Sequence, residues 1–355
     1  MLLIISDFTY PQHSGGVAKH IYYLDKFLQN TDVDYRIYGR GTEKTNYKTN
    51  EQANYGENAL FLSGGKWKFI ISLIFDSVRA KKIVCHYVIL GLLLVILKKI
   101  IRVQYTFFFH GPIDEEYEQK TGKKLGAYVR RKLQTIVIDN AEKILVHSKY
   151  MHEILLTKTA KSLNNVEYVP PFTFPDYDAE LQYDEDTLFD EPYILISRRL
   201  TARSGVSEFL QFIIKNNLFD RVPRIVITGE GEERNAIEEL SNASPHVNYL
   251  GHVSEIKLRT LVYNATAVVV PSKSLEGLGY IILEAMQSGT PAIVSDCCGG
   301  GKDFVHERFP DLVFRLGDEN SFLESLAASR KINRCSISSS VEYLTFENMV
   351  KIAYV

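Results

Sequence analysis

Short apolar runs alternate with longer amphipathic segments along the whole chain. In the first half, runs rich in β-branched and aromatic residues predict strands at Leu2–Ser6, Asp34–Tyr38, Ile83–His86, Gln104–Phe109 and Lys143–His147. Segments with apolar residues at helical spacing predict helices between them, at Gly16–Gln29, Trp67–Ala80, Ile89–Lys99, Leu125–Asn140 and Lys149–Leu156. This alternation predicts βαβ units and a parallel, doubly wound sheet.

The second half repeats the pattern. Its predicted strands are Tyr193–Ser197, Arg224–Thr228, Val247–Tyr249, Ala267–Val270, Ala292–Ser295 and Leu312–Phe314. Its predicted helices are Gly205–Asn216, Glu232–Ser241, Ser254–Asn264, Ile281–Ser288 and Asn320–Arg330. We therefore expect two Rossmann-like α/β domains.

A proline-rich segment separates the halves. Three prolines within Val169–Pro175 can continue neither a helix nor a central strand, and the acidic stretch Asp176–Glu191 follows. We place the boundary here, between an N-terminal domain at 1–170 and a C-terminal domain at 171–342. Because open α/β sheets bind ligands at the carboxyl ends of their strands, such a pair predicts a two-substrate site in a central cleft.

Composition is that of a globular protein of about two domains: 45% of the 355 residues are hydrophobic and 24% are charged. The apolar start Met1–Ser6 lacks the basic region and cleavage site of a signal peptide. The longest apolar run, Tyr87–Leu97, is far shorter than the roughly 20 residues of a membrane span. The four cysteines form no C-x2-C pair, so we expect no metal site, no disulfide framework and a cytoplasmic location.

The segment Val268–Pro291 carries the most informative chemistry. A buried strand leads into a loop with Gly277 and Gly279, and a helix follows. Glycines let backbone N–H groups approach a ligand, and a helix N-terminus adds unpaired donors, which together suit a diphosphate. Glu284 lies inside this helix among apolar neighbours, where two ribose hydroxyls could supply the donors that a carboxylate needs. A glutamate that faces solvent is the alternative.

The pattern P-S-x3-E-G-x-G-x4-E-A-M-x2-G-x-P in this segment closely resembles the signature of glycosyltransferase family 4, a family of retaining enzymes with the GT-B fold. The resemblance implies that Glu284 holds the ribose of a sugar nucleotide and that Glu276 meets the sugar hydroxyls. It also implies a diphosphate site made by the amides of Gly277, Leu278, Gly279 and Tyr280.

Other motifs agree in order and spacing. Pro11-x3-Gly15-Gly16 resembles the family's first glycine loop, and His110-Gly111-Pro112 resembles the element whose histidine lies beside the donor sugar. Arg199 falls on an arginine that binds the donor diphosphate. Gly229 falls in the turn behind the nucleotide, His252 and Val253 in the loop that reads the base, and Gly299–Gly301 near the donor. The end of the chain, 343–355, resembles the helix that packs back onto the first domain.

Two positions depart from the family pattern. Arg198 stands where the family has glycine, and Ser204 stands where a lysine normally also grips the diphosphate. We expect Arg203, one residue earlier, to take the role of that lysine, because a guanidinium can also neutralise charge on the leaving group.

The resemblance implies a retaining, metal-independent transfer of a hexose-type sugar, with a UDP-sugar favoured, to an acceptor bound by the first domain. Arg199, Glu276 and His110 would take part in catalysis, without a cofactor, and closure of the domains would accompany it. A non-catalytic sugar-nucleotide-binding subunit and a GT-B sugar-nucleotide epimerase are the alternatives.

The two halves of the chain differ in net charge, and this difference indicates what kind of acceptor the first domain could bind. Residues 1–170 carry 24 Lys and Arg against 16 Asp and Glu, whereas residues 171–355 carry 17 against 27. A basic first domain with apolar elements suits an anionic membrane surface at the inner face of the cell membrane, and a glycan or lipid-linked acceptor. A set of solvated helix faces is the alternative. No nucleic-acid partner is expected, since no recognisable module accompanies the charge.

Overall fold

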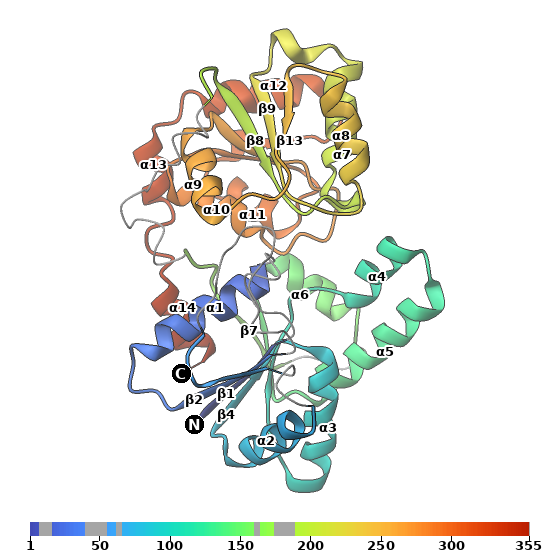
Figure 1. The fold of residues 1–355 in the computed structure, drawn as a ribbon, viewed down its shortest axis with the longest axis vertical. Helices are drawn as coiled ribbons and strands as arrows, with labels where there is room; N and C mark the ends of the chain where they lie inside the picture. The colour runs from blue at the N-terminus through green and yellow to red at the C-terminus, as the bar shows by residue number, and fades with distance from the viewer. Residues whose placement is uncertain (7–15, 40–54, 62–65, 160–163, 174–188, 355) are drawn as a thin grey trace. The chain divides into compact units, whose positions relative to one another are not determined.

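The computed structural model describes residues 1–6, 16–39, 55–61, 66–159, 164–173 and 189–354. It divides the chain into two compact units (Figure 1). Unit 1 comprises Met1–Pro170 and Glu347–Val355, and unit 2 comprises Pro171–Phe346. The second unit therefore ends four residues later than the predicted domain, and the chain ends in the first unit.

Unit 1 is built on a seven-stranded parallel sheet in the order β3-β2-β1-β4-β5-β6-β7. The strands are β1 (Leu2–Ser6), β2 (Tyr35–Gly39), β3 (Ala59–Phe61), β4 (Lys82–Cys85), β5 (Thr106–Phe108), β6 (Lys143–Val146) and β7 (Val166–Tyr168). Strands β1 and β5 are completely buried because helices cover both faces, which explains their continuous apolar runs.

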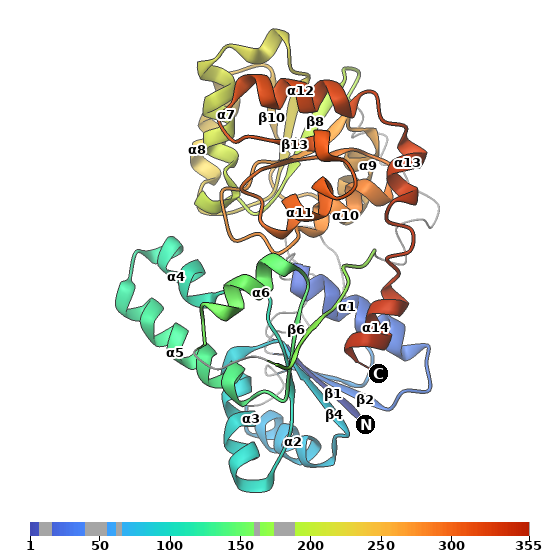
Figure 2. The same cartoon turned by 180° about the vertical axis from the view of Figure 1, so that it is seen from behind.

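The helices of unit 1 are α1 (Gly16–Gln29), α2 (Lys66–Arg79), α3 (Val88–Ile101), α4 (Ile113–Thr121), α5 (Lys124–Asn140), α6 (Lys149–Leu156) and α14 (Phe346–Ala353). Helices α1 and α14 lie side by side in both views, whereas α2, α3 and α5 gather on the other side of the sheet (Figures 1 and 2). The core joins strand and helix residues such as Ile5, Leu94, Phe107 and Val137.

Unit 2 has a six-stranded parallel sheet in the order β10-β9-β8-β11-β12-β13. The strands are β8 (Tyr193–Ser197), β9 (Arg224–Thr228), β10 (Val247–Tyr249), β11 (Ala267–Val270), β12 (Ala292–Ser295) and β13 (Val313–Phe314). The helices are α7 (Val206–Lys215), α8 (Arg234–Asn242), α9 (Glu255–Asn264), α10 (Tyr280–Gln287), α11 (Gly300–His306), α12 (Glu319–Ser329) and α13 (Arg334–Ser339). Helices α7 and α8 lie on one side of the strands and α9 and α10 on the other (Figure 1).

Both sheets share one order around their first strand, and this order locates the candidate site. The chain builds outward from β1 through β2 to β3, then returns to place β4 on the other side of β1. Unit 2 does the same around β8, with β11 on its other side. Connections that run in opposite directions leave a crevice at the carboxyl ends of these strands, where ligands of doubly wound sheets bind.

Some elements were missing from the prediction. Strands β3 and β7 are only three residues long. Helix α4 is polar along most of its length, and α11 begins with two glycines, so neither has the apolar period of a helix. The predicted C-terminal helix starts later than expected, at Phe346, and just before it the carbonyl of Leu344 accepts hydrogen bonds from the N–H and hydroxyl of Thr173. Within the described residues, no helix has the length and apolar character needed to cross a membrane.

Candidate active site

An ion pair joins the two loops that follow β8 and β11, at the carboxyl ends of the central strands of unit 2. Arg198 follows β8 and Glu276 lies in the loop after β11, and Nη2 of Arg198 contacts Oε2 of Glu276. Their side chains are 11% and 22% exposed. The predicted sugar-binding Glu276 is thus engaged by the arginine that stands in place of a glycine.

Arg198 has further donors that lie inside the protein. Its Nε and Nη1 are buried, and neither has a hydrogen-bond partner among the described residues. A buried donor without a partner costs about 1–3 kcal/mol. No role was predicted for Arg198, although its place directly after the first strand of a doubly wound sheet is a signal that could have identified it.

Arg199 and Arg203 differ in their surroundings. Arg199 is exposed. Arg203 lies in the short 3₁₀ helix η4 (Ala202–Ser204), and its Nη1 donates to the carbonyl of Leu275 at 3.2 Å. Its own carbonyl accepts from the N–H of Lys273 at 2.8 Å. Arg203 therefore braces the loop that contains Glu276.

Ser204 faces inward. Its hydroxyl donates to the carbonyl of Thr201 at 2.6 Å and accepts from the N–H of Thr201 at 3.2 Å, so it closes a capping box. The side chain is buried in this turn. The position at which the family pattern has a lysine thus carries a group that is used within the protein.

Tight backbone packing shapes the neighbouring loops. Gly229 has φ 123°, and a Cβ there would lie 1.8 Å from the carbonyl oxygen of Arg198. The N–H of Gly229 donates to the carbonyl of Gly251 at 2.8 Å, and the hydroxyl of Tyr249 donates to the carbonyl of Gly229. The half-buried His252 and Val253 follow Gly251 directly, so the structure places the predicted base-reading residues beside the turn at Gly229.

Helix α10 starts at Tyr280, one residue before the predicted start. Gly279 precedes its first residue, Tyr280, and has φ 80°, a conformation that suits glycine. The preceding Leu278 is buried, and Gly277 is half-buried. The N–H of Gly300 donates to the carbonyl of Glu276 at 3.0 Å, which ties the loop after β12 to this one.

Glu284 is buried in α10, only 4% exposed, so it does not face solvent. It lies four residues after Tyr280, on the same face of the helix. Burial, and then the charge of Glu284, raise the pKa of Tyr280, whose ring packs against Phe172. The carboxylate is therefore buried close to Tyr280.

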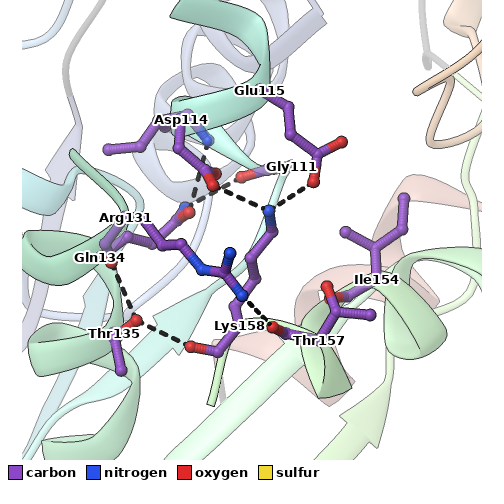
Figure 3. A network of polar contacts seen from close by, with 10 residues as sticks. Gly111, Asp114, Glu115, Arg131, Gln134, Thr135, Ile154, Thr157 and Lys158 are labelled. Carbon is purple, nitrogen blue, oxygen red and sulfur yellow. Dashed lines mark hydrogen bonds and ion pairs between the residues drawn. The ribbon is translucent and has the colours of Figure 1, made fainter. Parts of the chain in front are cut away.

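In unit 1, His110 follows β5, and the next residues are held firmly (Figure 3). The side chain of Gln134 donates to the carbonyl of Gly111 at 2.9 Å and accepts from the N–H of Ile113 at 3.3 Å. Nζ of Lys158, buried, pairs with Asp114 at 3.0 Å and also contacts Glu115. These contacts fix the backbone that carries His110.

Four histidines meet at the crevice of unit 1, and we call them the histidine cluster: His20, His86, His110 and His147. Nδ1 of His86 lies 2.7 Å from Nε2 of His110, and the ring of Phe108 stacks on both. The sequence analysis selected only His110. Gly16 is the first residue of α1, which carries His20, and Gly15 lies outside the described residues.

The histidine cluster is uncharged near neutral pH. Burial, and then the charge of His147, lower the pKa of His110 to about 3. Burial lowers the pKa of His147 to about 4, although its hydrogen bond to the carbonyl of Val169 opposes the shift. Burial and the other histidines hold the pKa values of His20 and His86 well below the usual range. Within the described residues, no group of histidine, cysteine and acidic side chains is arranged to hold a metal ion.

We predict that acidification destabilises the protein through this cluster. Unfolded histidine titrates near 6.5, so below that pH the unfolded chain binds protons that the folded chain excludes, and the free energy of unfolding falls. His110 and His147 together should lower it by about 3 kcal/mol between pH 7.5 and pH 5.5. Urea unfolding followed by circular dichroism measures this change, with the exposed-residue variant His246→Gln as control. Equal stability at the two pH values would contradict the prediction.

Comparison with known proteins agrees with the fold. Residues 181–331 match the model of the family described as glycosyl transferases group 1. A sucrose-phosphate synthase from Thermosynechococcus elongatus aligns with a TM-score of 0.69 and 18% identity over 99% of this chain and 97% of its own. The Anabaena protein HepE, solved with UDP and glucose, aligns with a TM-score of 0.65 and 13% identity over 97% and 99%. The predicted fold class is confirmed: two parallel α/β domains with the GT-B fold.

Sequence relatives cover less of the chain. An uncharacterized glycosyltransferase of Methanocaldococcus jannaschii is 33% identical over 37% of this chain, and the match spans 36% of that relative. A phosphatidyl-myo-inositol mannosyltransferase of Mycobacterium leprae is 30% identical over 30% of this chain and 26% of its own length. An amylovoran biosynthesis glycosyltransferase of Erwinia amylovora is 23% identical over 86% and 84%.

Proposed function

We propose that this chain is a glycosyltransferase that moves a hexose-type sugar from a nucleotide-diphosphate sugar to an acceptor hydroxyl, with retention of configuration and without a metal. One observation supports this proposal most. Residues 181–331, which match the family of glycosyl transferases group 1, include the carboxyl ends of the central strands of unit 2. Within it, Arg198, Arg199 and Glu276 follow the two strands at the crevice, and Glu284 lies in the next helix.

In this proposal, unit 2 binds the donor. Glu284 accepts hydrogen bonds from the two ribose hydroxyls, and its buried position in α10 would shield these bonds from water. Arg199 neutralises the diphosphate, with loop amides and the N-terminus of α10 beside it. A UDP-sugar is the favoured donor, which the likeness to the UDP-bound Anabaena protein supports. His110 of unit 1 meets the sugar.

Two cations can replace the missing lysine. Arg203 was the predicted one, and its bond to the carbonyl of Leu275 holds its guanidinium beside the loop that contains Glu276. Arg198 is the second, because its buried Nε and Nη1 would be satisfied by ligand oxygens while Nη2 contacts Glu276. An arginine in each position keeps positive charge near the proposed leaving group.

Incubation with a panel of sugar nucleotides tests the function. Purified protein should release free nucleotide from one donor, and release should accelerate when the acceptor is present. A sugar-nucleotide-binding subunit is the second candidate, favoured by the engagement of Glu276 with Arg198 and the inward-facing Ser204. It predicts saturable binding of a donor without release. Conversion of the sugar without nucleotide release would instead identify an epimerase.

We propose that unit 1 docks on an anionic membrane at the inner face of the cell membrane. There it would receive a lipid-linked acceptor for polysaccharide or glycolipid synthesis. Two neighbouring helices of unit 1 carry exposed apolar stripes at helical spacing: Trp67, Ile71, Phe75 and Val78 on α2, and Ile89, Ile96 and Ile100 on α3. Lysines and arginines lie on and beside them: Lys66, Lys68, Lys81, Lys98, Lys99 and Arg102. Apolar insertion flanked by cations suits an anionic bilayer.

We predict that the protein sediments with phosphatidylglycerol vesicles at low salt. The double variant Trp67→Ala, Phe75→Ala should bind at least ~10-fold more weakly, because each buried aromatic contributes about 1.5–3 kcal/mol. The matched control Ile256→Ala, Tyr343→Ala removes exposed apolar side chains from unit 2 and should bind like the parent. An absence of binding at low salt would refute the membrane proposal and favour solvated helix faces.

A further inference from the structure

A continuous chain of hydrogen bonds links the end of the polypeptide to His110. The hydroxyl of Tyr354, which follows α14, lies 2.9 Å from Nε2 of His20 and 2.8 Å from Nε2 of His86. Nδ1 of His86 lies 2.7 Å from Nε2 of His110. Tyr354, His20 and His86 are buried, with exposed fractions of 2%, 0% and 8%. The four side chains come from α1, from the residue after α14 and from the ends of β4 and β5, and they form one hydrogen-bonded chain.

In this hydrogen-bonded chain, the position of each proton fixes the positions of the others. Burial keeps the histidines neutral, so each ring carries one N–H and one bare nitrogen. The tyrosine hydroxyl has one hydrogen, so it donates to one of its two histidines and accepts from the other. Every contact needs one donor and one acceptor, which leaves two arrangements.

In the first arrangement, Tyr354 donates to His20, His86 donates from Nε2 to Tyr354, and His110 donates from Nε2 to His86. The remaining nitrogen of His110, Nδ1, is then bare and accepts a hydrogen bond. In the second, every direction is reversed, and Nδ1 of His110 carries the hydrogen and donates. In both, His86 and His110 have the same tautomer and His20 has the opposite one.

We propose that Tyr354 and His86 are positioning residues that set the tautomer of His110, and therefore whether its Nδ1 donates to or accepts from a hydroxyl-bearing ligand. This role rests on the proposed function, in which that ligand is the sugar of the donor. A neutral imidazole that can present either role meets a sugar hydroxyl without placing charge in a buried site. It also makes the C-terminal helix part of the site, although the whole of unit 2 separates this helix along the chain from the other elements of unit 1.

The protonated nitrogen of each ring can be measured directly. Long-range ¹⁵N–¹H spectra of protein labelled at histidine, assigned with single His→Gln variants, distinguish Nδ1–H from Nε2–H. His147 serves as an internal reference, because its Nδ1 lies 3.3 Å from the carbonyl of Val169 and must donate to it. At pH 7, His86 and His110 should share one tautomer, and His20 should have the other. Unlike tautomers at His86 and His110, like tautomers at His20 and His86, or a charged ring among the three would overturn the proposal.

The variant Tyr354→Phe separates a positioning role from a structural one. Loss of the hydroxyl should free the tautomer of His20 from that of His86 and lower kcat about 5-fold or more, with a smaller change in KM. Tyr105→Phe is the matched control, because it removes another buried tyrosine hydroxyl of unit 1, one that donates to the carbonyl of Val137. It should leave the tautomers and kcat unchanged. Equal effects of the two variants on kcat would overturn the proposal.

The experiments distinguish failure of the tautomer proposal from failure of the proposed function. The spectra of the unaltered protein decide the tautomers even if Tyr354→Phe does not fold. If no sugar nucleotide is turned over while the linked tautomers are observed, the hydrogen-bond chain stands and the assignment as a glycosyltransferase falls. If a sugar nucleotide is turned over while the tautomers of His86 and His110 are not linked, the assignment as a glycosyltransferase stands and the tautomer proposal falls.

Discussion

Replacement of Arg199 by alanine should lower kcat/KM for nucleotide release from the donor at least ~100-fold. Arg199 is exposed two residues after β8, at the point where the strand order of unit 2 reverses. There a guanidinium can form two parallel hydrogen bonds to phosphate oxygens and stabilise the charge that builds on the leaving group. Removal of one such donor typically costs about 2.7–4 kcal/mol of transition-state stabilisation. Steady-state release of nucleotide measures the change.

Controls make the Arg199 experiment specific. Arg221→Ala removes an arginine that pairs with Glu319 on the surface, just before β9 and hence at the amino ends of the strands, and should act like the parent. Arg199→Lys keeps the charge but loses the planar fork, so it should recover only part of the activity. Near-normal turnover by Arg199→Ala would contradict the role proposed for Arg199 and direct attention to Arg198.

The architecture was readable from the sequence because it depends on coarse signals. Buried parallel strands such as β1 and β11 are continuous apolar runs, and the helices between them carry an apolar stripe. Short elements were missed for a physical reason. Three residues at Ala59–Phe61 gain their hydrogen bonds from β2, and no local pattern encodes that pairing. The segment before α14 is held by Thr173, which is far away along the chain, and no local pattern encodes that contact either.

The candidate site was readable only in part. Residues that follow strands, such as Arg199 and His110, could be selected because the carboxyl ends of parallel strands gather at one edge. What each side chain contacts could not be read. Arg198 was noted only as a departure from glycine, yet it pairs with Glu276, because β8 and β11 are neighbours in the sheet. His20, His86 and Tyr354 come from three distant parts of the chain, and folding alone brings them together.

Replacement of Glu284 tests the other end of the donor. Glu284→Gln keeps the shape of the side chain but removes the charge and one of two acceptor oxygens, so the two ribose hydroxyls can no longer both donate to it. Hydrogen bonds to charged groups contribute about 1.5–3 kcal/mol each, so we expect the Kd for the nucleoside diphosphate to rise about 10-fold to 100-fold. Calorimetric titration measures it, and Glu239→Gln, at an exposed position on α8, is the control.

A second ligand identifies the partner of the carboxylate. If Glu284 binds the ribose, removal of the 2′-hydroxyl from the nucleotide should weaken binding to the parent protein but change binding to Glu284→Gln much less. The two losses then fail to add because both remove the same contact. If they do add, Glu284 does not touch that hydroxyl. Its burial in α10 beside Tyr280 would then have a structural cause, and the donor would have to be held by the arginines and the loop amides alone.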